Sequence, residues 1–127
     1  MRRNNHWHPA YIGIGSNLQG PGRQVKAAAG LLGEQEGLRV EATSSLYRST
    51  AFGGIEQPDF VNAVAAVLTT CTPLELLAQL KAIENRQGRD GDEVRWGPRV
   101  IDLDLLVYSG QTIDEPTLTV PHPGIGE

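Results

Sequence analysis

The sequence is poor in cysteine, aromatic residues and long apolar runs. Its single cysteine, Cys71, excludes an intrachain disulfide framework and a zinc site built from several thiolates, and it agrees with a reducing compartment. No segment approaches the roughly 18 consecutive apolar residues of a transmembrane helix, and residues 1–9 lack the apolar stretch of a secretory signal. We therefore expect a cytoplasmic protein that has no membrane partner.

Positive charge is also scarce overall. The 11 lysine and arginine residues face 15 aspartate and glutamate residues, and the resulting net charge of -4 argues against nucleic acid binding through bulk positive charge. The length of 127 residues suits one domain with a single core. We expect this domain to span residues 10–127, after a flexible N-terminal tail over residues 1–9.

Hydrophobic periodicity predicts six elements in the order strand, helix, strand, strand, helix, strand. We expect the strands at Ala10 to Gly15, Leu38 to Tyr47, Phe60 to Thr69 and Val100 to Tyr108. We expect one helix after the Gly20-Pro21-Gly22 turn, ending at Gly33, and another from Thr72 to just before Gly88. The glycines near the end of the first strand are interpreted as permitting a tight exit from it. This order is typical of a ferredoxin-like α+β sandwich (βαββαβ), in which helices cover an antiparallel sheet.

Two acidic residues of the last predicted strand indicate chemistry. Asp102 and Asp104 are two positions apart, so a strand places both carboxylates on one face. Like charges this close are unfavourable unless a positive group lies between them, and Mg²⁺ is a hard ion that carboxylate oxygens bind well. Neutralisation by Arg95 or Arg99 is the alternative at this point.

Basic residues are concentrated just before these aspartates. Four arginines fall within one short stretch, namely Arg86, Arg89, Arg95 and Arg99. The planar guanidinium suits phosphate oxygens, so the stretch predicts contacts with a nucleotide, and a solvated face of salt bridges is the alternative. Trp96, in a loop with glycine and proline, is predicted to close over a substrate or, alternatively, to anchor that loop to the core.

Downstream, Thr119 and His122 offer a hydroxyl group and an imidazole in an extended segment. His122 is predicted to donate to a phosphate or to transfer a proton, and an ordinary surface histidine is the alternative. A dinucleotide-binding loop is not predicted, because Leu18 replaces the third glycine of the G-x-G-x-x-G pattern that begins at Gly13.

Taken together, these segments resemble one enzyme family, the 6-hydroxymethyl-7,8-dihydropterin pyrophosphokinases of folate biosynthesis. The matching motifs, in family order, are Y-I-G-I-G-S-N-L at residues 11–18, S-L-Y-R-S-T at 45–50, Q-P-D-F-V-N at 57–62, G-R at 88–89, R-W-G-P-R-V-I-D-L-D at 95–104 and L-T-V-P-H-P at 118–123. The combination of R-W-G-P-R-x-x-D-L-D with a downstream V-P-H-P is far more specific than a glycine pattern. The resemblance covers nearly the whole chain from Ala10 onward.

The resemblance implies transfer of the terminal diphosphate of ATP to the hydroxymethyl oxygen of the pterin, with release of AMP. It implies that two Mg²⁺ ions are held by Asp102 and Asp104, and that catalysis also uses Arg89, Trp96 and Arg99. The ATP contacts it implies are Glu84, Arg89, Arg95, Trp96, Arg99, Leu105, Thr119 and His122. The pterin contacts it implies are Thr50, Ala51, Phe52, Gly53, Phe60, which would stack on the ring, and Asn62, which would hydrogen-bond its edge.

Two other hypotheses follow from the same residues. The family normally continues beyond V-P-H-P through an arginine and a phenylalanine that covers the other face of the pterin, and this sequence stops at Glu127. One alternative is therefore a C-terminally short relative that binds ATP or pterin without turnover, as an interaction module with partners such as other folate-pathway enzymes. The other, an RNA-binding ferredoxin-like module, is disfavoured because the predicted first and third strands lack the aromatic cluster of such modules.

Overall fold

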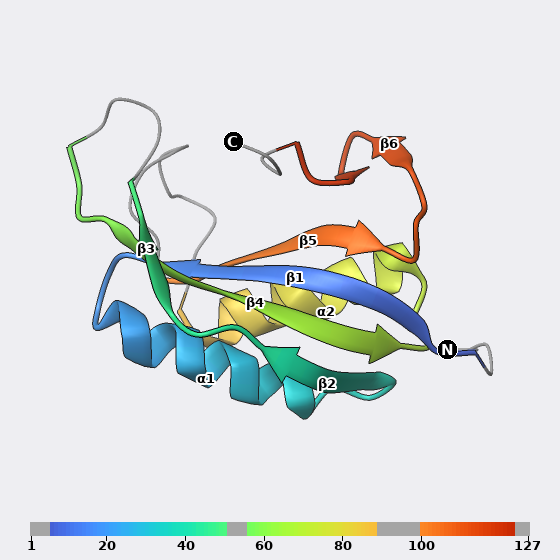
Figure 1. Cartoon of the computed structure of the whole chain (residues 1–127), viewed down its shortest axis with the longest axis horizontal. Helices are drawn as coiled ribbons and strands as arrows, with labels where there is room; N and C mark the ends of the chain where they lie inside the picture. The colour runs from blue at the N-terminus through green and yellow to red at the C-terminus, as the bar shows by residue number, and fades with distance from the viewer. Residues whose placement is uncertain (1–5, 51–55, 89–99, 124–127) are drawn as a thin grey trace.

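The computed structural model describes residues 6–50, 56–88 and 100–123. Within these ranges the chain forms two helices and seven strands (Figure 1). They are β1 (His8–Ser16), α1 (Pro21–Gly33), β2 (Leu38–Thr43), β3 (Tyr47–Ser49), β4 (Phe60–Thr69), α2 (Pro73–Arg86), β5 (Asp102–Tyr108), β6 (Ile113–Glu115) and β7 (Leu118–Val120). No helix in the described ranges is long and apolar enough to cross a membrane.

The main sheet has the strand order β2-β4-β1-β5, and β3 also pairs with β4. Every pair of neighbouring strands in it is antiparallel. Both helices lie on one side of this sheet (Figure 1). The ferredoxin-like α+β architecture expected from the order of elements is thus confirmed.

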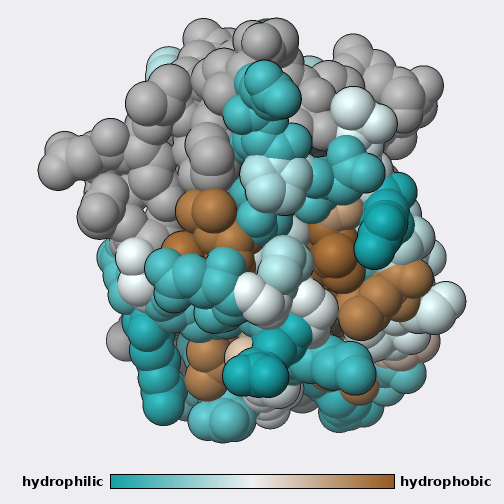
Figure 2. All heavy atoms as spheres, turned by 90° about the vertical axis from the view of Figure 1, so that its left-hand side faces the viewer, coloured by the Kyte–Doolittle hydropathy of each residue, from teal (hydrophilic) through white to brown (hydrophobic). Residues whose placement is uncertain are grey.

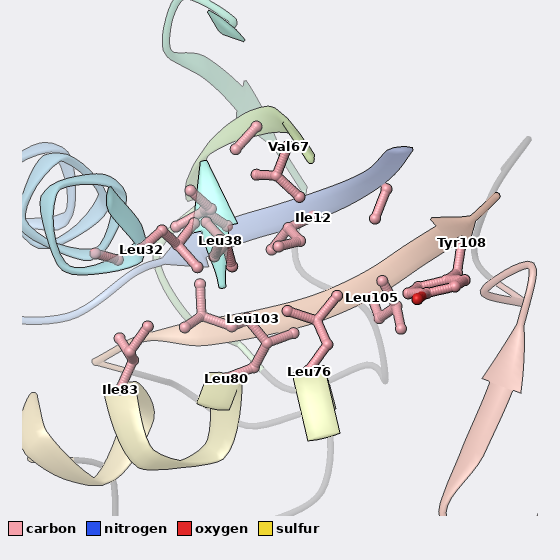
Figure 3. Close-up of a cluster of buried hydrophobic side chains, with 14 of the residues drawn as sticks. Ile12, Leu32, Leu38, Val67, Leu76, Leu80, Ile83, Leu103, Leu105 and Tyr108 are labelled. Atoms are coloured by element: carbon pink, nitrogen blue, oxygen red, sulfur yellow. The ribbon is translucent and has the colours of Figure 1, made fainter. Parts of the chain in front are cut away.

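The hydrophobic core fills the space between the helices and the sheet. Figure 3 shows side chains of α2, among them Leu76 and Leu80, facing Leu103 and Leu105 of β5. In β1 the core residues are alternate ones, such as Ile12, because successive side chains of a strand point to opposite faces. The residues between them belong to the other side of the sheet, which we call the outer face.

Helix α2 starts as the sequence predicts. The Thr72 N–H donates to Glu75 Oε1 (2.8 Å), and the Glu75 N–H donates to Thr72 Oγ1 (3.2 Å). This reciprocal pair is a capping box, and it satisfies two backbone donors that the first turn leaves free. Pro73 follows at the first helical position, where no backbone N–H is needed.

The single strand expected from Leu38 to Tyr47 is wrong, because the chain forms two strands there, β2 and β3. A bulge shifts the β2-β4 register after Val40, and β2 ends at Thr43. The next residue, Ser44, still bonds to β4, through its backbone and its side chain. Its N–H donates to the Val64 carbonyl (2.9 Å) and its Oγ accepts from the Val64 N–H (2.8 Å). Leu46, which continues the apolar alternation in the sequence, is consequently 41% exposed.

Two strand boundaries and one hairpin also differ from the predictions. Strand β1 starts at His8, so it includes two residues placed in the N-terminal tail, and β5 starts at Asp102 instead of Val100. The hairpin of β6 and β7 was not predicted. Its apolar residues Leu118 and Val120 are buried in the main core, which fixes the hairpin against the domain.

Candidate active site

Three of the predicted site residues, Asn62, Asp102 and Asp104, lie in two rows that run across three strands of the sheet. Gly15 of β1 is paired with Asn62 of β4 on one side and with Asp102 of β5 on the other. Gly13 is likewise paired with Val64 and Asp104. Because directly opposed residues in antiparallel strands point to the same face, both aspartates and Asn62 lie on the outer face. The rows are near the end of the sheet where β1 ends and β4 and β5 begin, on the left in Figure 1.

The two glycines of β1 let side chains of the neighbouring strands lie close against that face. A Cβ atom on Gly15 would lie 3.0 Å from Asn62 Oδ1 and 3.6 Å from Phe60 Cδ1, and one on Gly13 would lie 3.3 Å from Leu106 Cδ2. Both glycines are inside the β ladder, so the predicted tight exit from the strand is wrong. The sequence signal for this arrangement is the alternation of isoleucine and glycine at residues 12–15. In a strand, this alternation predicts one buried face and one face without side chains.

Asn62 is held so that its amide oxygen lies over the backbone of Gly15. Its Nδ2 donates to Ser49 Oγ (2.8 Å) and to the Tyr47 carbonyl (3.3 Å), both on the adjacent β3. The Oδ1 atom lies over Gly15, close to the ring of Phe60. Thr50 directly follows Ser49 and is exposed. An aromatic ring beside an oriented amide oxygen can bind a flat heterocycle through stacking and one polar edge.

The acidic pair lies in the edge strand β5, next to His122. The Nε2 atom of His122 is 3.6 Å from Asp104 Oδ1, and both side chains are partly exposed. The backbone N–H of His122 donates to the Leu106 carbonyl (2.9 Å), which attaches the segment after β7 to β5. A side-chain hydrogen bond with Asp104 raises the pKa of His122, burial lowers it, and the charges of Asp104 and Asp102 raise it further.

The two carboxylates fit a magnesium site in their chemistry. Mg²⁺ is bound in proteins by one or two carboxylates and keeps its other positions for water and phosphate oxygens. Asp102 and Asp104 offer this donor set on the outer face of the sheet. Among the described residues no group of three or more His, Cys, Asp or Glu side chains is placed to hold a metal without such additional ligands.

Two residues with predicted ATP contacts have structural roles. Glu84 on α2 is 4% exposed, and its Oε2 accepts from the backbone N–H of Leu103 (2.8 Å), between the two aspartates. Lys81 Nζ lies 4.0 Å from Glu84 Oε1. Leu105 is 3% exposed and lies in the core (Figure 3), so a contact between ATP and Leu105 would have to use its backbone.

The remaining predicted residues divide into exposed and undescribed ones. Thr119 is exposed between two buried residues of β7, which leaves its hydroxyl group on the side away from the core. Outside the described residues lie Ala51, Phe52, Gly53, Arg89, Arg95, Trp96 and Arg99. Their roles, the closing loop and the arginine neutralisation of the aspartates therefore stay predictions.

The surface at this end of the molecule is mixed in character. Figure 2 faces it and shows apolar patches of limited size separated by polar side chains. A site that binds an aromatic ring next to charged phosphates needs both kinds of surface close together.

Comparisons with known proteins show the family to which the sequence is similar. The sequence model of a family described as 7,8-dihydro-6-hydroxymethylpterin-pyrophosphokinase matches residues 11–127. A Pseudomonas putida protein named 2-amino-4-hydroxy-6-hydroxymethyldihydropteridine pyrophosphokinase is 49% identical over 113 residues, which are 89% of this chain and 92% of that protein. Proteins of the same name from Haemophilus influenzae and Pseudomonas aeruginosa are 45% and 47% identical, over 89% and 88% of this chain and 70% and 68% of their own lengths.

Proposed function

The chain belongs to the 7,8-dihydro-6-hydroxymethylpterin-pyrophosphokinase family, and we propose that it transfers diphosphate from ATP to 6-hydroxymethyl-7,8-dihydropterin in folate biosynthesis. The hydroxymethyl oxygen of the pterin forms a bond to the β-phosphorus of ATP. The bond between that phosphorus and the oxygen bridging to the α-phosphate breaks, so AMP leaves. The hydroxyl proton passes to water.

The observation that carries this proposal is the row formed by Asn62, Gly15 and Asp102. Neighbouring strands lie about 4.8 Å apart, so about 10 Å separate the backbones of Asn62 on β4 and Asp102 on β5. The row therefore places a binding region for a flat heterocycle, on β4, next to a binding region for phosphates, on β5. This is the arrangement that an attack by a pterin hydroxymethyl group on a nucleotide requires.

On the β4 side, Phe60 stacks against the pterin ring, and Asn62 Oδ1 accepts from an N–H on its edge. The bonds from Asn62 Nδ2 to β3 hold the amide in this orientation before the ligand arrives, which lowers the entropy lost on binding. Thr50 and residues 51–53 complete this side through their backbone. The glycine at position 15 lets Asn62 Oδ1 and the Phe60 ring lie close to the sheet.

On the β5 side, Asp102 and Asp104 would hold two Mg²⁺ ions. The ions would supply neutralisation of the ATP phosphate charge and polarisation of the reacting oxygens. Glu84 holds the backbone between these aspartates, and His122 lies within ion-pair distance of Asp104. The other proposed ATP contacts are Arg89, Arg95, Trp96, Arg99, Thr119 and His122, with Trp96 on the closing loop.

Both proposed substrates are small molecules, and neither a nucleic acid nor a membrane has a part in this reaction. We also propose that this activity is cytoplasmic. Association with another folate-pathway enzyme, which would receive the pterin diphosphate, belongs to the same proposal.

The test is product formation by the purified chain. With ATP, MgCl₂ and 6-hydroxymethyl-7,8-dihydropterin, we expect AMP and pterin diphosphate in equal amounts, and no AMP when the pterin is omitted. Asp104→Asn is expected to lower kcat at least about 100-fold. The matched control is Asp114→Asn, which changes an exposed aspartate of β6. Calorimetric binding of Mg-ATP without AMP at high enzyme concentration would instead support the non-catalytic alternative.

A further inference from the structure

We propose that Asn17 is a positioning residue for the pterin side of the site. Its side chain links the end of β1 to the segment that leads into β4. Asn17 directly follows β1 and is 2% exposed. Its Nδ2 donates to Gln57 Oε1 (2.9 Å) and to the Pro58 carbonyl (2.9 Å), so both amide hydrogens bind one short segment forty residues away.

The position of these bonds explains why they are needed. The ladder between β1 and β4 ends at the pair of Ser16 and Val61. The residues before Val61 therefore have no ladder partner on the β1 side, and Phe60 is paired only with Ser49 of β3 among the described strands. The Asn17 side chain continues the attachment to β1 beyond the end of the ladder.

The attached segment includes Pro58, two residues before Phe60. Proline has no backbone N–H, so its carbonyl is the one backbone hydrogen-bonding group by which it can be held. Two bonds at Gln57 and Pro58 fix the path of the chain into β4, and with it the plane in which the Phe60 ring stands over Gly15. Without them, the ring and its neighbour Asn62 would have more conformations to lose when the pterin binds.

A direct contact between Asn17 and the substrate does not agree with its burial, because a side chain that is 2% exposed offers little surface to a ligand. A role limited to fold stability is the competing explanation. A positioning role predicts a higher KM for the pterin, whereas a role limited to fold stability predicts a lower Tm with unchanged KM values. This inference rests on the proposed function, since it concerns the pterin site of that reaction.

The test compares Asn17→Ala and Gln57→Ala with the wild-type chain. Asn17→Ala removes both bonds, and we expect the KM for the pterin to rise about tenfold, the effect of about one hydrogen bond. The KM for ATP is expected to change less than about twofold. Gln57→Ala removes one of the bonds and should raise the pterin KM less, and the double variant should be no worse than Asn17→Ala because the two residues act through one shared bond.

The matched control is Gln79→Ala. The Gln79 amide also joins two distant segments, because its Nε2 donates to the Glu36 carbonyl (2.9 Å). This contact lies near the start of β2, at the opposite end of the sheet from the site (Figure 1). We expect it to alter stability at most and to leave both KM values unchanged.

Hydrogen exchange supplies a readout that does not depend on turnover. Asn17→Ala should speed exchange of the backbone N–H groups of residues 57–62 and leave those of α2 unchanged. If the wild-type chain makes no AMP, the proposed function fails while this measurement still decides the positioning role. Equal rises of both KM values, a lower Tm with unchanged KM values, or a pterin effect of the same size in Gln79→Ala would overturn the inference. If Asn17→Ala does not fold, Gln57→Ala, which retains the bond to Pro58, decides by the same criteria.

Discussion

Gly15→Ala is the substitution that adds a methyl group beneath Asn62 and Phe60 on the pterin side. The added Cβ would lie 3.0 Å from Asn62 Oδ1 and 3.6 Å from Phe60 Cδ1. The first distance is shorter than ordinary van der Waals contact by a few tenths of an ångström. Asn62 cannot easily move away, because its Nδ2 donates to Ser49 Oγ at 2.8 Å. The amide oxygen would have to leave the place from which it meets the pterin.

The expected magnitude combines two small losses. A displaced amide oxygen loses about one hydrogen bond to the ligand, and a methyl group under the ring disturbs its stacking on Phe60. Each is worth about 1 kcal/mol, so the pterin Kd should rise about 30-fold. The free energy of unfolding should change by less than about 1 kcal/mol, because alanine restricts the unfolded chain more than glycine does and this gain offsets the close contact.

The assay is calorimetric titration of the pterin in the presence of Mg²⁺ and an ATP analogue with a methylene group between the α- and β-phosphorus. This analogue keeps the phosphates and lacks the bond that breaks. The matched control is Gly13→Ala, whose Cβ meets the flexible side chain of Leu106 at 3.3 Å and should change the pterin Kd less than about threefold. Pterin binding by Gly15→Ala within twofold of wild type, or equal losses in both variants, would show that the side chains over Gly15 do not hold the pterin.

Three further outcomes are expected. Glu84→Ala leaves the buried N–H of Leu103 without its acceptor, so it should lower the free energy of unfolding by about 2 kcal/mol and the Tm by roughly 7 °C, which thermal unfolding measures. In the metal-free protein the pKa of His122 is raised above its ordinary value of 6.5. The attraction between protonated His122 and Asp104 therefore stabilises the fold fully below pH 6.5, and this stabilisation is lost as the pH rises through the raised pKa. An NMR titration should show that pKa fall when Mg²⁺ is added, and an unchanged value would contradict metal binding at Asp104. Gly30→Ala in the middle of α1, where a Cβ meets nothing within 4 Å, should raise the Tm by about 4 °C at unchanged kcat.

The local signals in the sequence predicted much of the fold. The capping box at Thr72 and Glu75 gave the start of α2, and the spacing of Asp102 and Asp104 predicted that both lie on one face of a strand. These features depend on residues close together in the chain. The break at Ser44 could not be predicted in this way, because it depends on a hydroxyl group that meets Val64 of another strand.

The parts of the candidate site that were missed depend on packing between distant segments. The bond from Leu103 to Glu84 forms because α2 passes beneath the edge of β5, and no periodicity encodes that contact. The ladder between β1 and β4 ends at the pair of Ser16 and Val61. Asn17 follows β1 and Gln57 precedes β4, so their side chains meet just beyond that end. The sequence contains the Glu84 carboxylate and the Asn17 amide, but their hydrogen-bond partners are evident only from the three-dimensional arrangement.

We propose that the outer face around Gly15 joins a pterin side to a phosphate side for diphosphate transfer. The most direct measurement is ³¹P NMR of the purified chain with ATP, Mg²⁺ and 6-hydroxymethyl-7,8-dihydropterin. We predict that the ATP resonances are replaced by those of AMP and a pterin diphosphate ester, and that Asp102→Asn slows this replacement at least about 100-fold. Release of ADP or inorganic phosphate in place of AMP, or undiminished turnover by Asp102→Asn, would contradict the claim.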